Sequence, residues 1–497
     1  MVTSKTISLF LIIFAIGLLL RIFSFQGCIG SDDLHYAELA HKMATGTFTV
    51  KNDFDISRMR IGLVAPVALA FKFMGISEWA MVIYPFLASL AGIILAFWSG
   101  RMFFNDRVGL IAALFMAILP FDARFASTLN TDIPSSLMST ASILLLCAGS
   151  RNASLSAKFS IGALAGIMMG MAWLTRESAA FLLPFFGAYL LWLAWHMRQN
   201  VALLFGAAFT GMSVFIIEAW IYYNLTGDFM YRFHCIANLA QSAWGFNTNA
   251  FNNVQAVSVW RRLFIIGPFN IFLNPYFGLS TIYACLAITY AACRKLKPFL
   301  FSSLWFLFLV LVYNFGTTNL HTYTPLNLGD RYLYPLLFPA IILTAGLIDI
   351  LLRPPFFNRP WPEIDRQRLV AGILLTASLV FVCTVCNAKN LLAGKESPVE
   401  RSLQHILTTN DVIYTDTRTA WVLHFFWKYP PVQRTYDFSD RDDSDFRTSA
   451  YVLINRNRVD FLKSMYLYKP PKFYNNIPHH WKLKWSGYNA ELYYIPT

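Results

Sequence analysis

Four short polar motifs interrupt an otherwise apolar sequence, and each carries residues that could take part in catalysis. The first motif, Gly30-Ser-Asp-Asp-Leu-His-Tyr, places Asp32 and Asp33 side by side, with Tyr36 one helical turn later. A carboxylate in this position could act as a general base that removes the proton from an attacking hydroxyl. The alternative is a structural role, in which Ser31 or Asp32 caps the helix that follows.

The second and third motifs add a carboxylate and an adjacent pair of opposite charges. Asp132 lies in Asn130-Thr-Asp-Ile-Pro, where it could be a second carboxylate of the site or an ordinary helix start. Arg176 and Glu177 are neighbours between two apolar runs. They could neutralise each other, or the guanidinium of Arg176 could face a phosphate.

The fourth motif, Asp330-Arg-Tyr-Leu-Tyr-Pro, places Arg331 at the start of an apolar helix. An arginine there is poorly placed for the helix dipole, so we expect it to bind an anion together with the helix amides. The alternative is an ion pair between Asp330 and Arg331. Arg58 and Arg60 precede another apolar segment and are candidates for the same anion or for lipid head groups.

Four residues of the sequence could also bind a metal ion. Asp33, Asp132, His234 and His321 are candidate ligands, but no pair of them has ligand spacing, which favours ordinary polar roles for the two histidines. Clustered carboxylates would hold a divalent ion such as Mg²⁺, Mn²⁺ or Zn²⁺ readily, and this alternative stays open.

The elements that must position these residues are membrane helices. The 497 residues are 56% hydrophobic and 13% charged, and runs of roughly 20 apolar residues, enough to cross a bilayer, recur up to residue 390. We expect a mainly α, polytopic membrane protein with about eleven spans, near residues 7–25, 79–99, 108–126, 133–150, 159–174, 178–196, 201–223, 272–292, 298–316, 332–352 and 369–390. The first run has no cleavage site and predicts a retained helix. Segment 61–75 is short and broken by Pro66, which indicates a re-entrant or interfacial helix.

Basic residues set the expected orientation. The short loops after every second span carry Arg or Lys, for example Arg101 and Arg107, so these loops and the N-terminus should be cytoplasmic. The net charge of +13 follows from the same rule and does not call for a nucleic-acid partner. All four motifs then fall on the extracytoplasmic face of the plasma (inner) membrane.

The chain divides into two predicted domains. Residues 1–390 form the transmembrane domain, with outer loops at 26–78 and 224–271, and residues 391–497 form a small extracytoplasmic α/β domain. Strand-like runs at 411–415, 450–454 and 490–495 and a helix at Thr419–Trp427 support the second domain.

Taken in order, the motifs resemble those of the GT-C superfamily of membrane glycosyltransferases, in the branch with protein O-mannosyltransferases and lipid A aminoarabinose transferases. Asp32-Asp33 with Tyr36 looks like the first-loop Asp-Glu motif of the family, and Asp132-Ile-Pro looks like its second acidic motif. Arg331-Tyr-Leu-Tyr-Pro is similar to its Arg-Tyr-x-x-Pro segment. The sequence departs from the family at Asp33, where Glu is usual, which puts in doubt any metal role of the longer side chain.

The resemblance implies an inverting glycosyltransferase. Its donor would be one hexosyl or pentosyl unit on polyprenyl phosphate, and its acceptor lipid A, a glycan, a glycolipid or a protein of the cell envelope, within the membrane lipids. The implied roles are Asp32 as base, with Asp33 and Asp132 sharing the catalytic site; donor phosphate binding by Arg60, Arg176, Arg331 and Tyr332; and support from Arg58, Tyr36, Glu177 and Asp330. The alternatives are a polysaccharide polymerase or ligase and a flippase for lipid-linked sugars. A polymerase should depend on a large outer loop rich in Arg and His, which 224–271 is not, and a flippase should carry its charges deep within the spans.

Overall fold

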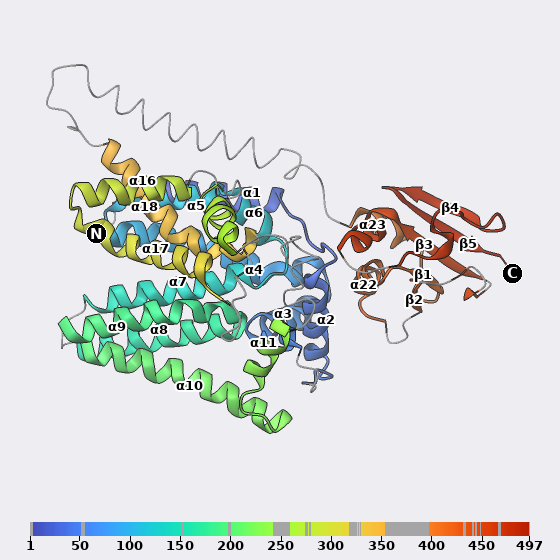
Figure 1. The fold of residues 1–497 in the computed structure, drawn as a ribbon, viewed down its shortest axis with the longest axis horizontal. Coiled ribbons are helices and arrows are strands. Elements are labelled where there is room, and N and C mark those ends of the chain that lie inside the picture. The colour runs from blue at the N-terminus through green and yellow to red at the C-terminus, as the bar shows by residue number, and fades with distance from the viewer. Residues whose placement is uncertain are drawn as a thin grey trace, which may run out of the picture.

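The computed structural model of the chain describes residues 3–50, 55–151, 154–196, 200–241, 259–273, 277, 280–317, 326, 328, 330–352, 397–430, 434–439, 442, 445–447, 449–465 and 469–496. These residues form a large helical part and a small sheet domain beside one end of it (Figure 1). The predicted fold class, a mainly α membrane protein with a small C-terminal α/β domain, is confirmed.

The helical part contains seven described segments that are long and apolar enough to cross a bilayer: α1 (Ser4–Phe23), α4 (Glu78–Phe103), α7 (Asp132–Gly149), α8 (Leu155–Thr175), α10 (Val201–Thr226), η7 (Lys297–Phe299) with α17 (Leu300–Phe315), and η8 (Asp330–Leu336) with α18 (Leu337–Leu352). Shorter apolar helices are α3 (Ile61–Met74), η2 (Glu177–Leu182) with α9 (Leu183–His196), and α16 (Ser280–Cys293). The expected span 369–390 lies outside the described residues, so the count of about eleven stays a prediction.

Two of the expected segments differ from the structure at a proline. The expected span 108–126 is two helices, α5 (Asp106–Ile118) and α6 (Pro120–Ala126), because Pro120 has no amide hydrogen and begins a new helix after the extended Leu119. Pro66, in contrast, lies inside the continuous helix α3 and does not break it. A single missing backbone bond is tolerated there because α3 packs against three other helices.

Small residues allow the closest helix contacts. A Cβ at Gly162 or Gly166 of α8 would overlap the backbone of α10, and one at Gly206 of α10 would overlap α8. Helix α18 lies at the centre of the bundle, with 78% of its span buried in the protein. The predicted span at 272–292 begins later, at Ser280, after the short helix α15 (Gly267–Phe272).

Short helices cover the end of the bundle that faces the sheet domain. They are α2 (Asp32–Ala44), η1 (Ile56–Met59) and α11 (Tyr231–Gln241), with α3 beside them (Figure 1). A further irregular segment consists of α14 (Val259–Arg261) and η5 (Arg262–Ile266), which lead into α15. The first polar motif therefore begins a helix of this covering layer.

The C-terminal domain is a five-stranded sheet with helices. Its elements are α21 (Pro398–Leu403), β1 (Ile413–Thr415), α22 (Thr417–Phe426), β2 (Thr435–Asp437), β3 (Ala450–Asn455), α23 (Arg456–Met465), η10 (Lys472–Tyr474), β4 (Lys482–Gly487) and β5 (Ala490–Ile495). The strand order is β2-β1-β3-β5-β4, parallel from β2 to β3 and antiparallel from there on. The predicted strands correspond to β1, β3 and β5 and the predicted helix to α22, whereas β2 and β4 were not predicted.

Candidate functional site

The two carboxylates of the first motif have different surroundings. Asp33 is buried, and its side chain accepts hydrogen bonds from the backbone amides of Ile29, Gly30 and Ser31 at 2.8, 3.3 and 2.6 Å. Ser31, the N-cap residue of α2, makes no side-chain cap bond, so the expected cap by Ser31 is not formed. Asp33 instead binds the amides of the preceding loop. Asp32 points away from that loop, with 47% of its side chain exposed.

Asp32 forms an ion pair with the arginine of the fourth motif. Its Oδ2 lies 2.8 Å from the Nη2 of Arg331, which comes from η8, some 300 residues away along the chain. The same nitrogen lies 3.3 Å from the hydroxyl of Tyr332, and the Arg331 guanidinium lies 5.2 Å from the centre of that ring. The expected alternative, a local ion pair between Asp330 and Arg331, stays a prediction, because the side chain of Asp330 lies outside the described side chains.

The second and third motifs meet beside the same ring, that of Tyr332. Arg176, buried between α8 and η2, forms an ion pair with Asp132 at the start of α7 and lies 3.4 Å from the hydroxyl of Thr131. The Arg176 guanidinium also lies 4.5 Å from the centre of the Tyr332 ring. Two cations thus contact one aromatic ring, whose negative face attracts both.

A second ion pair supports this arrangement from the side. Arg60 binds both carboxylate oxygens of Glu177, at 2.6 and 3.2 Å, and also contacts the hydroxyl of Tyr36 on α2. Arg176 and Glu177, neighbours in sequence, therefore each have a partner from a different helix. The expected mutual neutralisation gives way to two cross-links between distant segments.

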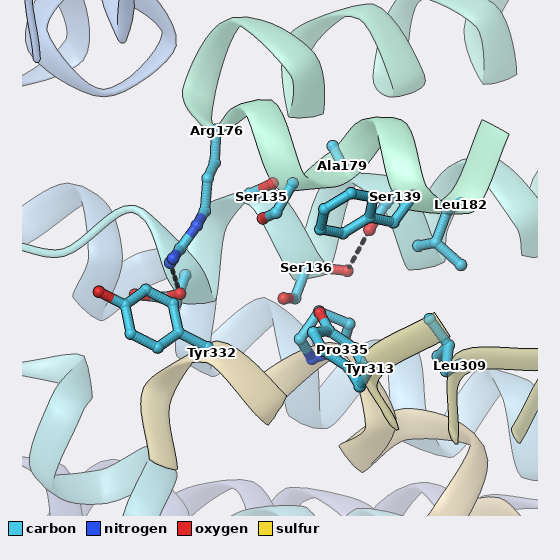
Figure 2. A pocket seen from close by; sticks show the side chains of 13 residues that line it. Ser135, Ser136, Ser139, Arg176, Ala179, Leu182, Leu309, Tyr313, Tyr332 and Pro335 are labelled. Carbon is cyan, nitrogen blue, oxygen red and sulfur yellow. Dashed lines mark hydrogen bonds and ion pairs between the residues drawn. The ribbon is translucent and has the colours of Figure 1, made fainter. Parts of the chain in front are cut away.

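A hollow with about 330 Å³ of empty space, part of it open to solvent, adjoins the cluster. Asp132, Arg176 and Tyr332 line it together with hydroxyls of α7 and aromatic rings of η2 and α17. Figure 2 shows Arg176 and Tyr332 at one end, Leu182 and Leu309 at the other, and Ser135, Ser136 and Ser139 between them. Asp32 and Arg331 do not line this hollow; they adjoin it through Tyr332.

The charges around Asp32 favour its ionised form. Burial works to raise the pKa of Asp32, but the guanidinium of Arg331, helped by Arg60 and Arg418, outweighs it and lowers that pKa below its usual value. For Asp33, burial raises the pKa, and the three amide bonds oppose this shift without cancelling it. The pKa values of the two neighbouring carboxylates thus shift in opposite directions, and their contacts differ as well.

Several expected residues have partners away from this cluster. Arg58 binds the carboxylate of Asp55 at 3.3 Å and the carbonyl of Thr49 at 2.8 Å. His234 is half exposed and lies 2.6 Å from Asp228, and His321 lies outside the described residues. Among the residues that the structure describes, no three His, Cys, Asp or Glu side chains gather as metal ligands.

The three expected metal candidates that the structure describes therefore do not share a site. Asp33 binds backbone amides, Asp132 binds Arg176 and His234 binds Asp228. A divalent ion would need two or more of these oxygens and nitrogens to converge on one point. The residues described do not fit such an ion.

Sequence reasoning missed a buried charged network below the cluster. Asp122 of α6 forms an ion pair with Arg21 of α1 and accepts hydrogen bonds from the hydroxyls of Ser89 and Tyr334. Arg21 also donates to the backbone carbonyls of Gly17, Ala117 and Met116 at 2.8, 3.0 and 3.2 Å. The available signal was the presence of Arg21 and Asp122 within apolar runs, because such residues are costly there unless paired.

A second missed network lies at the base of α11. Glu218 of α10 accepts a bond of 2.6 Å from the indole of Trp173 and pairs with Arg232. Arg232 also donates to the carbonyl of Met59, the residue before Arg60, at 3.2 Å. This network fixes the backbone that carries Arg60.

One family model and several solved structures match the chain. The model of the family described as dolichyl-phosphate-mannose-protein mannosyltransferase matches residues 65–221. The structure of ArnT from Cupriavidus metallidurans bound to undecaprenyl phosphate superimposes with a TM-score of 0.59 at 13% identity, covering 99% of this chain and 98% of that one. The chain has the fold of the GT-C glycosyltransferases.

The GT-C fold is also that of a larger archaeal protein. The oligosaccharyltransferase AglB from Archaeoglobus fulgidus, in complex with an inhibitory peptide and a dolichol-phosphate, matches with a TM-score of 0.58 at 13% identity, over 93% of this chain and 71% of that one. A structure of the Archaeoglobus fulgidus oligosaccharyltransferase in complex with Zn and sulfate gives a TM-score of 0.56 at 13% identity, over 90% and 68%. No curated protein sequence matches the chain. The predicted resemblance to the GT-C superfamily, in the branch with the mannosyltransferases and ArnT-like enzymes, is confirmed.

Proposed function

We propose that the protein is an inverting glycosyltransferase. It moves one hexosyl or pentosyl unit from a polyprenyl-phosphate donor to a hydroxyl of a cell-envelope acceptor, on the extracytoplasmic face of the plasma membrane. The observation that carries this proposal is the continuous cluster in which the half-exposed Asp32 adjoins Arg331, Tyr332, Arg176 and Asp132. A base and two phosphate-binding cations at the ends of apolar helices are the groups that such a reaction needs.

In the proposed reaction, Asp32 accepts the proton of the acceptor hydroxyl. The acceptor oxygen then bonds to the anomeric carbon, and the bond from that carbon to the phosphate oxygen breaks, with its electron pair leaving on the phosphate. Arg331 and Arg176 stabilise the charge that develops on the phosphate. A single displacement, in which the acceptor oxygen attacks the carbon opposite the leaving phosphate, inverts the configuration.

The ion pair between Asp32 and Arg331 gives this site a built-in order of events. Without donor, Arg331 lowers the pKa of Asp32 and so makes it a weaker base. A donor phosphate that shares the Arg331 guanidinium would reduce this effect and add a negative charge of its own. The pKa of Asp32 would rise, and the base would become stronger when a donor is in place.

The remaining expected residues hold the cluster in position. Arg60, Glu177 and Tyr36 tie α2 to the junction of α8 and η2, beside Arg176. Arg60 stays a candidate phosphate ligand, although its contacts with Glu177 and Tyr36 already occupy several of its donors. No step of the proposed reaction uses a metal ion, because the candidate ligands have separate partners.

The direct test uses purified protein in nanodiscs with a polyprenyl-phosphate sugar. The donor sugar and acceptor are first identified by mass spectrometry of envelope glycans and lipid A from cells with and without the gene. We expect release of polyprenyl monophosphate, transfer of one sugar, and a product of inverted configuration by NMR. Release of a polyprenyl diphosphate would instead identify a polymerase or ligase, and a retained configuration would remove Asp32 as the base.

The orientation is tested separately. A cysteine at Gly487, in the C-terminal domain, should react with a membrane-impermeant thiol reagent in intact spheroplasts. Protection of that cysteine until the membrane is permeabilised would reverse the proposed sidedness.

A further inference from the structure

The loop that carries Asp32 has little regular structure of its own. Residues 25–30 link α1 to α2, and Gly27 and Gly30 have φ of 73° and 79°, where glycine is favoured. Its backbone amides bind side chains and a carbonyl from elsewhere, such as Cys28, whose amide lies 3.0 Å from the carboxylate of Glu78. The position of Asp32 therefore depends on the groups that surround this loop.

The C-terminal domain supplies one set of those groups. Arg401 of α21 makes a two-pronged ion pair with Glu78, the residue that binds the Cys28 amide, and its Nη2 lies 3.4 Å from the carbonyl of Gln26. Both side chains of the pair are largely buried. A bidentate arginine–carboxylate pair in such surroundings fixes orientation as well as position.

A second arginine of the same domain reaches Gly30, the first residue of the first motif. Arg458 of α23 donates to the carbonyl of Gly30 at 3.3 Å and to the hydroxyl of Ser397 at 2.9 Å. It also pairs with the fully buried Glu400 at 2.9 Å. A Cβ on Gly30 would overlap the Arg458 guanidinium, and a Cβ on Gly27 would overlap Glu78, so loop and domain fit closely.

Apolar packing completes the contact. Val422 and Phe425 of α22 belong to the same buried cluster as Leu34 and Ala37 of α2. Tyr429, just after α22, stacks on His41 of α2, with ring centres 4.7 Å apart. In Figure 1, α22 and α23 lie on the side of the domain that faces the helical part.

We propose that Arg401 and Arg458 of the C-terminal domain are positioning residues for Asp32, which they hold through the carboxylate of Glu78 and the carbonyls of Gln26 and Gly30. The domain thereby completes the site that the membrane helices begin. The catalytic part of this inference rests on the proposed function, because it takes Asp32 as the base. The structural part, that the domain orders the loop at 26–31, does not.

The test compares two full-length variants, Arg401→Gln and the double variant Glu400→Gln/Arg458→Gln, with the wild-type protein. The double variant avoids leaving Glu400 buried without its counter-charge, which alone could unfold the domain. Hydrogen–deuterium exchange should be faster for the amides of residues 26–34 in both variants. The turnover number should fall by about 10- to 100-fold, as for other misplacements of a reacting group, while the KM for donor changes little, because Arg176 and Asp132 pair with each other on the membrane helices.

Arg456→Gln is the matched control. Arg456 precedes Arg458 by two residues on α23, but it pairs with Glu491 of β5 at 2.8 Å, inside the domain. This variant should leave both turnover and loop exchange unchanged, and Arg401→Lys should restore part of the turnover because it keeps the charge.

Three outcomes separate this inference from the proposed function. Unchanged exchange at residues 26–34 in both test variants would overturn the inference whatever the enzyme does. A loss of turnover in Arg456→Gln equal to that in the test variants would also overturn the inference, because it would show a general effect of the domain. Faster exchange in the two test variants, combined with a wild-type protein that transfers no sugar, would leave the loop contact standing and remove the proposed function alone.

Discussion

Two charged clusters lie next to the same short helix, η8, and they are built from the same chemical groups. Each has an aspartate, an arginine and a tyrosine of η8: the outer cluster uses Asp32, Arg331 and Tyr332, and the inner one uses Asp122, Arg21 and Tyr334. Chemical type alone does not tell them apart. The difference lies in how many of their bonds are already made within the protein.

The inner cluster is saturated. Both oxygens of Asp122 and all three nitrogens of the Arg21 guanidinium have hydrogen-bond partners, and the side chains of both residues are 0% exposed. In the outer cluster, Asp32 is half exposed, and the buried Nε of Arg176 has no hydrogen-bond partner among the described residues. A saturated pair stabilises a fold, whereas an unsaturated one retains the capacity to bind a substrate.

The largest expected effect is on turnover in the outer cluster. Asp32→Asn removes the proposed base but keeps a side chain of the same shape, so the turnover number should fall by about 10²- to 10⁴-fold while the thermal unfolding temperature stays unchanged. Turnover is measured with purified protein and saturating donor. Asp106→Asn is the control, because Asp106 pairs with Arg101 at the same distance of 2.8 Å and with 34% exposure. Near-normal turnover in Asp32→Asn would remove the functional contrast between the clusters.

A comparable loss, but of stability, is expected in the inner cluster. Asp122→Asn leaves the buried Arg21 without a counter-charge, which should cost about 3–5 kcal/mol. Tryptophan fluorescence during thermal unfolding in one detergent gives the comparison. The double variant Arg21→Met/Asp122→Leu should regain most of this loss, since it removes both charges together. An unaltered unfolding temperature in Asp122→Asn would mean that the inner pair is not structural.

Donor binding sharpens the comparison at the outer cluster. Arg331→Gln should weaken the binding of polyprenyl phosphate by about 10- to 100-fold, because a hydrogen bond to a charged group contributes about 1.5–3 kcal/mol. Binding is measured by isothermal titration in nanodiscs. Arg101→Gln serves as the matched variant, with 35% exposure of the side chain in both arginines. Equal affinities of Arg331→Gln and wild type would contradict the phosphate assignment.

Substitution of the two tyrosines of η8 should have smaller effects on stability, and the two effects should differ from each other. Tyr334→Phe removes the hydroxyl that donates to Asp122 and should lower the free energy of unfolding by about 1 kcal/mol. Tyr332→Phe keeps the ring between Arg331 and Arg176 and should change stability by only a few tenths of that. Thermal unfolding of the two variants side by side measures the difference. A larger loss in Tyr332→Phe would reverse the contrast.

The smallest expected effect is a displacement between two pH profiles. Asp32 must be ionised to act as a base, and Arg331 lowers its pKa in the free protein, so kcat/KM should fall only below the usual aspartate range. In the donor complex the phosphate raises that pKa, so kcat should fall at a higher pH than kcat/KM does. Steady-state rates across an acid pH series give the pH at which kcat and kcat/KM each fall. If kcat falls at the same pH as kcat/KM or at a lower one, the phosphate does not act on Asp32.

The sequence predicted the elements of the site better than its pairings. Long apolar runs and a shift to alternating strands at the C-terminus were enough for the fold class, because they reflect burial in lipid and in a sheet. The motifs around Asp32, Asp132, Arg176 and Arg331 were found by type and spacing, and the structure brings their side chains together. Their roles in catalysis remain predictions.

The partners could not be predicted because neighbours in sequence compete with distant residues. Arg176 precedes Glu177, yet it pairs with Asp132, and Arg331 pairs with Asp32, some 300 residues away along the chain. Which of these pairs forms depends on how helices pack, and a single sequence does not contain that register. The contact of Arg458 with Gly30 depends in the same way on the docking of a separate domain.

The central position of α18 also bears on how the protein responds to its membrane. Only 17% of the α1 span and 22% of the α10 span are buried in the protein, against 78% for the span of η8 and α18. The outer helices therefore experience a change in bilayer thickness directly, by tilting or by exposing their ends. η8 and α18 contact mainly other helices, so Arg331 and Tyr332 stand on a support that is shielded from the lipid. We expect the geometry around them to be preserved in bilayers of different thickness, while the periphery adapts.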